Sequence, residues 1–113
     1  MKSLEDEIEE KISAIYDTEY HMYTNTKPYE NMFCFLVHNT SETVALLDIT
    51  NRKTVDETTV ELMSTEPYDI KGTPLSKRVI VYLGPSQVIE KHDTLIHCVN
   101  SEEFLNDAVD ALA

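Results

Sequence analysis

The chain has 113 residues, of which 42% are hydrophobic and 27% charged, and its formal net charge at pH 7 is −12. This length and composition predict one folded domain, residues 1–113, and exclude a fibrous or wholly disordered chain. The sequence has no run of 18 apolar residues, and it becomes acidic at Glu5 without an apolar segment, so we expect neither a membrane span nor a secretory signal. Two cysteines in apolar surroundings, Cys34 and Cys98, indicate a reducing cytoplasm.

The excess of acidic residues is concentrated at the two ends of the chain. Residues 1–23 contain seven acids and two bases, and residues 100–113 contain four acids and no base. Residues 24–99 are nearly balanced, with ten acids and seven bases. Such a charge distribution repels nucleic acids and anionic membranes and attracts basic proteins. Acids that merely keep a small protein in solution are the alternative explanation.

A helix is predicted from about Leu4 to about Tyr20. Ser3 is a suitable N-cap, and acids follow it in the first turn, where the helix dipole favours negative charge. Apolar residues at helical spacing form one stripe, which consists of Leu4, Ile8, Ile12, Ile15 and Tyr16. Four acids lie away from this stripe and are expected to face solvent: Glu5, Asp6, Glu9 and Glu10.

Two consecutive strands, Met32–Val37 and Thr43–Thr50, are predicted to form a hairpin at the centre of the sheet. The first of them is a six-residue run without a polar break, which indicates a strand covered on both faces. In the second strand Asp48 shares a face with Val44 and Leu46, so a carboxylate is expected beside apolar side chains.

The second half of the chain is predicted to contain three or four further strands and a helix. The strands are Thr58–Ser64, which alternates and is rich in threonine, then Val79–Leu83, Val88–Lys91 (or a turn) and Thr94–Val99. Residues 65–78 lack periodicity and are predicted to be irregular, or to contain a short helix near residues 68–71. A helix follows Asn100 or Ser101; its apolar stripe is Phe104, Leu105, Ala108, Val109 and Leu112, and Asp107 and Asp110 lie on its outer side.

This order of elements predicts an α+β fold with a mostly antiparallel five- or six-stranded sheet and two amphipathic helices, one N-terminal and one C-terminal. Two strands with apolar residues on both faces need cover on both sides, and two helices do not obviously supply it. A homodimer is therefore expected as one way to cover the remaining surface.

The residues that could carry chemistry are not arranged in a recognisable catalytic or ligand-binding motif. The four histidines and two cysteines lack CxxC, HxH or HExxH spacing, so no metal site is predicted. Both cysteines lie in apolar runs, which makes a thiol inert, and there is no GxSxG motif and no glycine-rich phosphate loop. We therefore assign no catalytic residue, no metal ligand and no cofactor, and expect a protein that is not an enzyme.

By elimination, the acidic surface is the candidate site. The main hypothesis is an acidic inhibitor that docks on the basic, nucleic-acid-binding surface of a nuclease or toxin, inside a bacterium or a phage-infected cell. Toxin-immunity proteins and phage inhibitors of restriction or CRISPR nucleases are of this class. The residues assigned to the partner are Glu5, Asp6, Glu9, Glu10, Asp107 and Asp110.

Two alternatives stay open at this point. The predicted order of helix, three strands, irregular segment, strands and helix is similar to that of type III secretion chaperones, which are small, acidic and dimeric. That resemblance implies a dimeric chaperone that binds an unfolded partner segment in an apolar groove, and it covers order and charge only. The third hypothesis is a small-ligand binder or enzyme built on residues 65–78 with His92 or His97 nearby.

Overall fold

The computed structural model describes residues 3–22, 33–38, 43–65, 69–70 and 72–112, with side chains except at residues 20–22, 33 and 108–112. In chain order its elements are α1 (Leu4–Ser13), β1 (Asp17–Met22), β2 (Phe33–His38), β3 (Val44–Ile49), α2 (Glu57–Thr65), β4 (Asp69–Ile70), β5 (Thr73–Tyr82), β6 (Gln87–Lys91), β7 (Thr94–Asn100) and α3 (Ser101–Leu112). The predicted α+β class agrees with this order.

The strands form one mixed sheet in the order β1-β2-β3-β5-β7-β6, with β4 paired to the start of β5. β1, β2 and β3 are antiparallel neighbours, as are β6 and β7. The two central pairings, β3 with β5 and β5 with β7, are parallel. The prediction of a mostly antiparallel sheet missed this parallel centre, because a parallel pair needs a crossover connection and the crossover helix α2 was taken for a strand.

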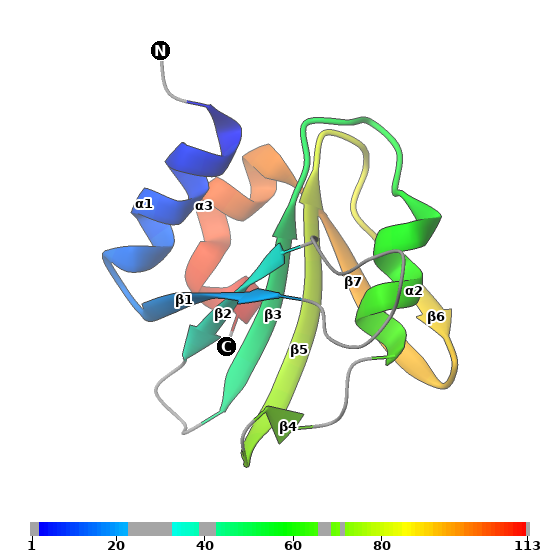
Figure 1. Ribbon diagram of the computed structural model, residues 1–113. Helices are drawn as coiled ribbons and strands as arrows, with labels where there is room; N and C mark the ends of the chain where they lie inside the picture. The colour runs from blue at the N-terminus through cyan, green and yellow to red at the C-terminus, as the bar shows by residue number, and fades with distance from the viewer. Residues whose placement is uncertain (1–2, 23–32, 39–42, 66–68, 71, 113) are drawn as a thin grey trace.

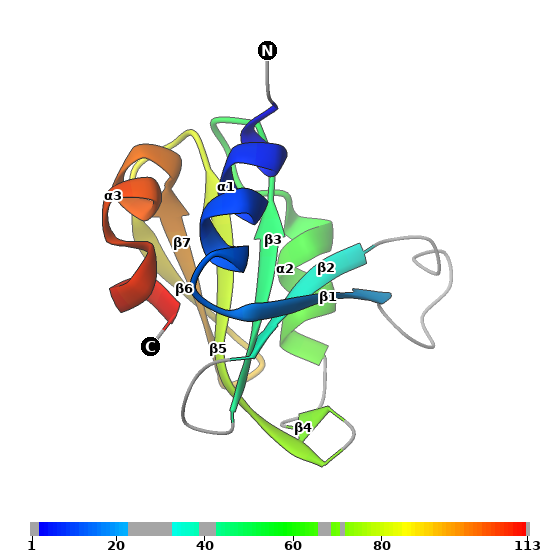
Figure 2. The same cartoon turned by 90° about the vertical axis from the view of Figure 1, so that its left-hand side faces the viewer.

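The helices cover both faces of the sheet. Figures 1 and 2 show α1 and α3 side by side on one face and α2 on the opposite face. Side chains alternate along the central strands, so each strand contributes to both layers. The layer under α1 and α3 is built from Ile8, Ile12, Tyr16, Phe35, Val37, Ala45, Leu47, Val79, Val81 and Phe104. The layer under α2 is built from Cys34, Leu36, Val44, Leu46, Val60, Leu62, Met63, Ile70, Ile80, Tyr82, Ile96 and Cys98.

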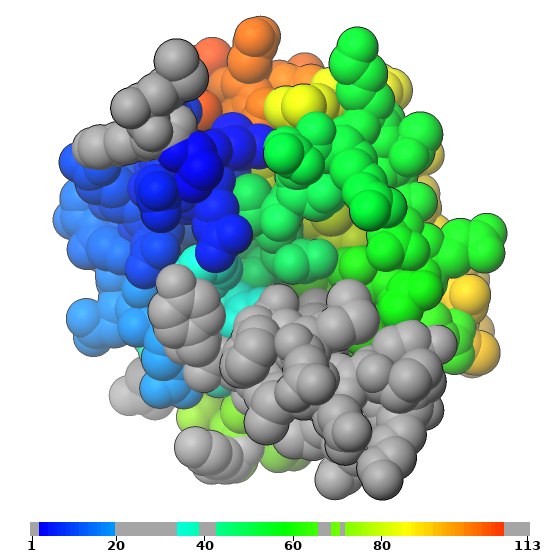
Figure 3. All heavy atoms as spheres, turned by 45° about the horizontal axis from the view of Figure 1, so that its top comes forward, coloured from blue at the N-terminus to red at the C-terminus, as the bar shows by residue number. Residues whose placement is uncertain are grey.

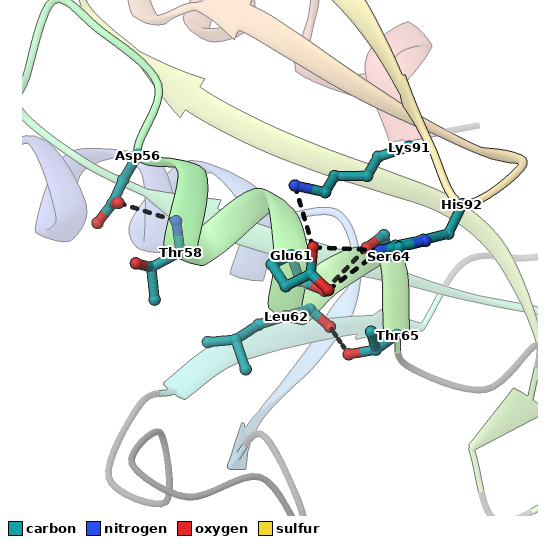
Figure 4. A network of polar contacts seen from close by, with 8 residues as sticks. All are labelled: Asp56, Thr58, Glu61, Leu62, Ser64, Thr65, Lys91 and His92. Carbon is teal, nitrogen blue, oxygen red and sulfur yellow. Dashed lines mark hydrogen bonds and ion pairs between the residues drawn. The ribbon is translucent and has the colours of Figure 1, made fainter.

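The predicted strand at residues 58–64 is wrong, since these residues form helix α2. Asp56 caps it: its side chain accepts a hydrogen bond from the Thr58 amide at 3.0 Å, and its carbonyl accepts one from Val60 at 3.1 Å (Figure 4). Val60 and Met63 then fall on the buried side at helical spacing. The threonine-rich composition pointed to a strand, but the capping aspartate and tertiary packing outweigh that propensity.

Polar contacts tie α2 to the strands beneath it. Glu61 accepts from Lys91 Nζ at 3.0 Å and lies 3.1 Å from His92 Nε2, both at the β6–β7 turn (Figure 4). The hydrogen bond from Lys91, and then that from His92, keep the pKa of Glu61 below its ordinary value. On the buried side, Arg78 of β5 donates from Nε to the Met63 carbonyl at 2.8 Å. The helix is thus attached at both its outer edge and its C-terminal turn.

The predicted N-terminal helix is too long. α1 ends at Ser13, and two amides, those of Ile15 and Tyr16, turn back to the Ile12 carbonyl at 2.9 and 2.8 Å. The chain then enters β1 at Asp17, a strand that was not predicted. Tyr16 still packs in the core, whereas Ile15 is 44% exposed. The apolar stripe was extended by one turn because these residues continue the helical spacing after the backbone has left the helix.

The segment predicted to be irregular is partly β-structure. Residues 69–70 form β4, which excludes the short helix suggested there, and β5 already begins at Thr73. Residues 66–68 and 71 lie outside the described residues, as do the predicted turn at 39–42 and Met32 at the start of the predicted hairpin. The predicted order therefore changes in its middle: three strands, β1 to β3, still follow the first helix, but α2 and β4 then precede β5. The chaperone hypothesis stays a prediction.

The remaining strands agree with the structure, and the last helix begins where it was predicted; Phe104 of its stripe is buried, and the side chains of Ala108, Val109 and Leu112 lie outside the described residues. The predicted hairpin is β2 and β3, the predicted strand Val79–Leu83 lies in β5 except for Leu83, which follows the last β5 residue Tyr82, and Val88–Lys91 and Thr94–Val99 correspond to β6 and β7. Because α2 covers the second face of the sheet, the need for a second copy to cover that face disappears.

We predict that Asp56→Ala lowers the free energy of unfolding by about 1 kcal/mol, since it removes the N-cap of α2. Asp56→Asn removes the same charge but keeps a side-chain oxygen that can accept the hydrogen bond, so it is the matched control. It should lower the free energy of unfolding by only a few tenths of a kcal/mol. Urea denaturation of the three proteins measures the difference. Equal stability of the Ala and Asn variants would show that the cap contributes nothing.

Candidate protein-binding surface

The first turn of α1 places several carboxylates in solvent next to the helix N-terminus. Ser3 has an extended backbone and accepts a hydrogen bond from the Asp6 amide at 3.1 Å, so the helix begins where the sequence predicted. Ile8 and Ile12 are buried and hold one side of the helix on the sheet. Because the acids occupy the other helical positions, the anchoring of two isoleucines determines where the charges point.

The side chain of Asn100 caps α3 and attaches its start to the loop between β5 and β6. Asn100 Oδ1 accepts from the Glu102 amide at 3.0 Å, which caps the helix. The same amide group donates from Nδ2 to the carbonyls of Leu83 at 3.3 Å and Gly84 at 2.8 Å. Phe104 is fully buried beneath the helix. Asn100 therefore fixes both the beginning and the position of α3.

The three helices begin at the same edge of the sheet. The parallel strands β3, β5 and β7 all end there, and the segments that follow them lead into α2, β6 and α3 (Figures 1 and 2). Figure 3 looks toward this edge and shows the blue atoms of α1 beside the green atoms that follow β3, with orange α3 atoms behind. We call this the carboxyl edge. The first turns of the helices bring acids to it: Glu5, Asp6 and Glu7 from α1, Glu57 from α2, and Glu102 and Glu103 from α3.

The sequence-predicted partner residues fall into three groups. Glu5, Asp6 and Glu10 are exposed on α1, and Glu9 on the same helix is half-buried. Asp107 is exposed on α3, where the backbone departs from helical geometry with φ −126° and ψ 34°. Asp110 belongs to α3, but its side chain lies outside the described residues. The structure places the two predicted helices next to each other, so α1 and α3 acids belong to one face.

Sequence reasoning missed the contribution of Glu102 and Glu103. They were treated only as first-turn residues, whereas Asp107 and Asp110 were selected because they lie on the outer side of the helix. α1 and α3 both begin at the carboxyl edge, so the first turns of the two helices lie toward the same end of their shared face (Figure 2). The carboxylate of Glu103 is held in place there, because it accepts a hydrogen bond from the Ser86 hydroxyl. The relative direction of two helices is not readable from periodicity.

Asp48 is an acid with an unusual environment near the same edge. Burial raises its pKa from 3.8 to about 6, and the charges of Glu5 and Asp56 add to the rise. Hydrogen bonds from the Ile49 backbone and from Thr59 act in the opposite direction. The sequence placed this carboxylate among apolar neighbours, which agrees with the structure. Asp48 lies on the sheet face that α2 covers, with Val44 and Leu46, so it is not part of the acidic face of α1 and α3.

Hollows also lie among the described residues, and three of them bear on the hypotheses above. One of about 260 Å³ lies at the carboxyl edge between Leu4 and Thr50. One of about 390 Å³ lies between α2 and β6, with Val55, Tyr82 and Ile89 in its wall. One of about 270 Å³ lies beside Lys77 and His97, near the segment that the small-ligand hypothesis selected. His92, the other histidine of that hypothesis, is exposed and bonded to Glu61 instead.

The chemistry that these groups could support is limited. Within the described part of the chain, no three His, Cys, Asp or Glu side chains are grouped as metal ligands. Cys34 and Cys98 are buried free thiols, and burial raises the pKa of Cys98. Burial also lowers the pKa of His97, and the nearby Lys77 charge adds to this effect.

We predict that Asp48→Asn becomes more stabilising as pH rises. The folded pKa of about 6 exceeds the unfolded value of 3.8, so the folded state holds this proton more tightly and loses stability as pH rises through that window. The stability difference between Asp48→Asn and the wild type should therefore increase by about 2 kcal/mol between pH 4 and pH 7.5. Urea denaturation at both pH values measures it, with Asp69→Asn, an exposed site on β4, as control. A difference that does not change with pH would contradict the prediction.

Comparisons with protein families, with curated proteins and with solved structures found no match to this chain. In the part of the chain that the structure describes, no helix has the length and apolarity needed to cross a membrane. What this protein binds therefore has to follow from its own surface.

Proposed function

We propose that this protein is a non-enzymatic, acidic inhibitor that binds a basic, nucleic-acid-binding surface of another protein inside the cell. The observation that carries the proposal is the placement of α1 and α3 side by side on one face of the sheet. Had the two acidic helices covered opposite faces, a single partner surface could not meet both.

The charge on this face is dense and nearly one-signed. α1 carries five acids and one base within ten residues, and α3 carries four acids and no base within twelve. A nuclease or toxin that binds nucleic acid presents lysines and arginines to phosphates, and a carboxylate array of similar extent competes for the same groups. Toxin-immunity proteins and phage inhibitors of restriction or CRISPR nucleases act on such surfaces.

Some of the acids of α1 stabilise the helix itself, and these have to be distinguished from the acids that could contact a partner. Glu5 and Asp6 lie in the first turn of α1, where negative charge stabilises the helix by a few tenths of a kcal/mol each. Glu9 and Glu10 lie beyond that turn, so the helix dipole does not account for them. Ser3 provides the cap, and the buried Ile8 and Ile12 anchor the helix on the sheet.

We predict that E5Q/D6N/E9Q/E10Q weakens partner binding by about tenfold or more, a loss of about 1.4 kcal/mol. The matched control E19Q/D69N/E90Q/D93N removes four charges outside α1, α3 and the carboxyl edge and should bind nearly as well as the wild type. Both are compared with the wild type by capture from native host lysate, elution in steps of salt, and titration of the purified partner.

The expected partner is a basic nucleic-acid-binding protein that elutes as salt rises and that loses its nucleic-acid binding when this protein is added. A partner that stays bound through high salt would contradict the proposal. So would a partner that binds the two quadruple variants equally well. Unchanged circular dichroism and urea midpoints for both variants would exclude unfolding as the cause of lost binding.

A further inference from the structure

The hollow between α2 and β6 combines a largely apolar wall with one end at the carboxyl edge. Its volume of about 390 Å³ lies within the range of about 300–1,000 Å³ that is typical of small-molecule sites. The wall is made by the segments that follow β3 and β5, by α2 and by β6, and Figure 1 shows α2 beside β6. Its apolar members are Val55, Val60, Tyr82, Pro85 and Ile89.

The topology of the sheet selects the same place. In open sheets with parallel strands, ligands bind beyond the carboxyl ends of the strands, where the connections lead to opposite faces. Here the connection after β3 leads to α2 on one face, and the connection after β7 leads to α3 on the other (Figures 1 and 2). β5 lies between these two strands, and the hollow is lined by the segments that follow β3 and β5.

These two segments are held tightly against each other. The Leu83 amide donates to the Arg52 carbonyl at 2.9 Å, which continues the contact of β3 with β5 beyond the strand ends. A Cβ on Gly84 would lie 2.5 Å from the Lys53 carbonyl oxygen and 2.7 Å from Cε2 of Tyr82, so only glycine permits this approach. The backbone that carries Lys53 is therefore fixed before a ligand arrives.

Tyr82 provides a rigid floor to the hollow. Its side chain is fully buried, and its hydroxyl donates to the Pro85 carbonyl and accepts from Gln87 Nε2 at 3.1 Å. Donor and acceptor are thus both used within the protein, and the ring contributes apolar surface. A preformed hollow of this kind needs little ordering on binding, which favours affinity.

The hollow is elongated along β6. Its members from this strand are the alternate residues Gln87, Ile89 and Lys91, which share the face toward α2. Four residue steps of a strand span about 13 Å, so the hollow extends well beyond the floor at Tyr82. An elongated apolar wall of this length fits an unbranched chain.

Lys53 supplies a free positive charge at the carboxyl-edge end of the hollow. Its side chain is exposed, and it forms no ion pair with any residue that the structure describes. Lys91, at the other end, is already paired with Glu61 at 3.0 Å (Figure 4). Glu57 also lines the hollow, and its charge disfavours a ligand with two negative charges. The charges therefore match a single anionic group beside Lys53.

The other two hollows described above lack this combination. The one beside Leu4 has Glu5 in its wall and no basic residue. The one beside Lys77 and His97 has basic residues, but Leu95 is the single large apolar side chain in its wall. Of the three, the hollow between α2 and β6 alone joins an elongated apolar wall to an unpaired cation.

We propose that the hollow between α2 and β6 binds a small carboxylate with an unbranched apolar chain. The chain lies along Ile89 and Val60, and the carboxylate pairs with the Lys53 ammonium at the carboxyl edge. This site is on the face of the sheet opposite α1 and α3, so it is additional to the inhibitory function and does not depend on it.

The test is a titration of the isotope-labelled full chain, followed by amide NMR, with octanoate and separately with octanol, which has the same chain length and no charge. Octanoate should shift the signals of residues 53–60 and 87–91 and leave those of α1 unchanged. It should bind about fivefold more tightly than octanol, the gain expected from one exposed ion pair.

A charge variant and its control test the role of Lys53. K53Q should lower the affinity for octanoate by about fivefold, to that for octanol. K11Q removes the same charge from an exposed position on α1, and it should bind octanoate as the wild type does.

A second pair of variants tests the hollow itself. V55F fills the hollow and should lower the affinity for both probes by about tenfold or more. V88F enlarges an exposed valine of β6 that faces away from α2, and it should bind both probes normally. The NMR spectrum of each variant reports its folding, and K53Q decides the outcome if V55F unfolds.

The absence of octanoate-induced shifts around the hollow would overturn the proposal. So would octanol that binds as tightly as octanoate, or equal octanoate affinities of K53Q and K11Q. Because these titrations need no partner protein, their outcome is separate from that of the α1 variants, which test the inhibitory function.

Discussion

The structure depends on two central strands that are buried on both faces. β3 and β5 pair in parallel, and the side chains of each alternate between the layer under α1 and α3 and the layer under α2. Such a pair is stable in water only when helices cover both sides, because the folded state forgoes roughly 25 cal/mol of stabilisation for every Å² of apolar surface left in contact with water. The chain meets this requirement by placing α2 in the crossover between the two strands and the terminal helices on the opposite face.

This arrangement also determines where the charge lies. With both faces of the sheet occupied, the acids of α1 and α3 can point only outward, and the common starting edge of the helices gathers their first-turn carboxylates together. Helix dipoles favour negative charge there, so Glu5, Asp6 and Glu102 have a structural role as well. Glu9 and Glu10 lie beyond the first turn of α1, so the helix dipole does not account for their charge. Asp48 differs from these exposed acids, because it is held among apolar neighbours, and burial of its charged form lowers the stability of the folded protein at neutral pH.

Sequence patterns predicted the strongly apolar elements and failed where two explanations fit the same residues. The apolar runs Met32–Val37 and Val79–Leu83 correctly predicted β2 and the end of β5, and Asn100 or Ser101 followed by acids predicted the start of α3. Residues 58–64 alternate like a strand, yet their apolar positions also fit a helix, and the capping role of Asp56 decides between the two. The acidic helices were predictable as acidic and amphipathic. Their shared face was not, because it results from parallel pairing between strands far apart in the sequence.

The most direct test of the acidic-inhibitor account is a hydrogen-exchange footprint of the protein in complex with its captured partner. Binding through the acidic face should slow exchange in α1 and α3 and leave α2 and β4 unchanged, since those elements lie on the other side of the sheet or at its far edge. Protection confined to α2 and the neighbouring hollow, with α1 and α3 unaffected, would contradict the account and assign recognition to the opposite face.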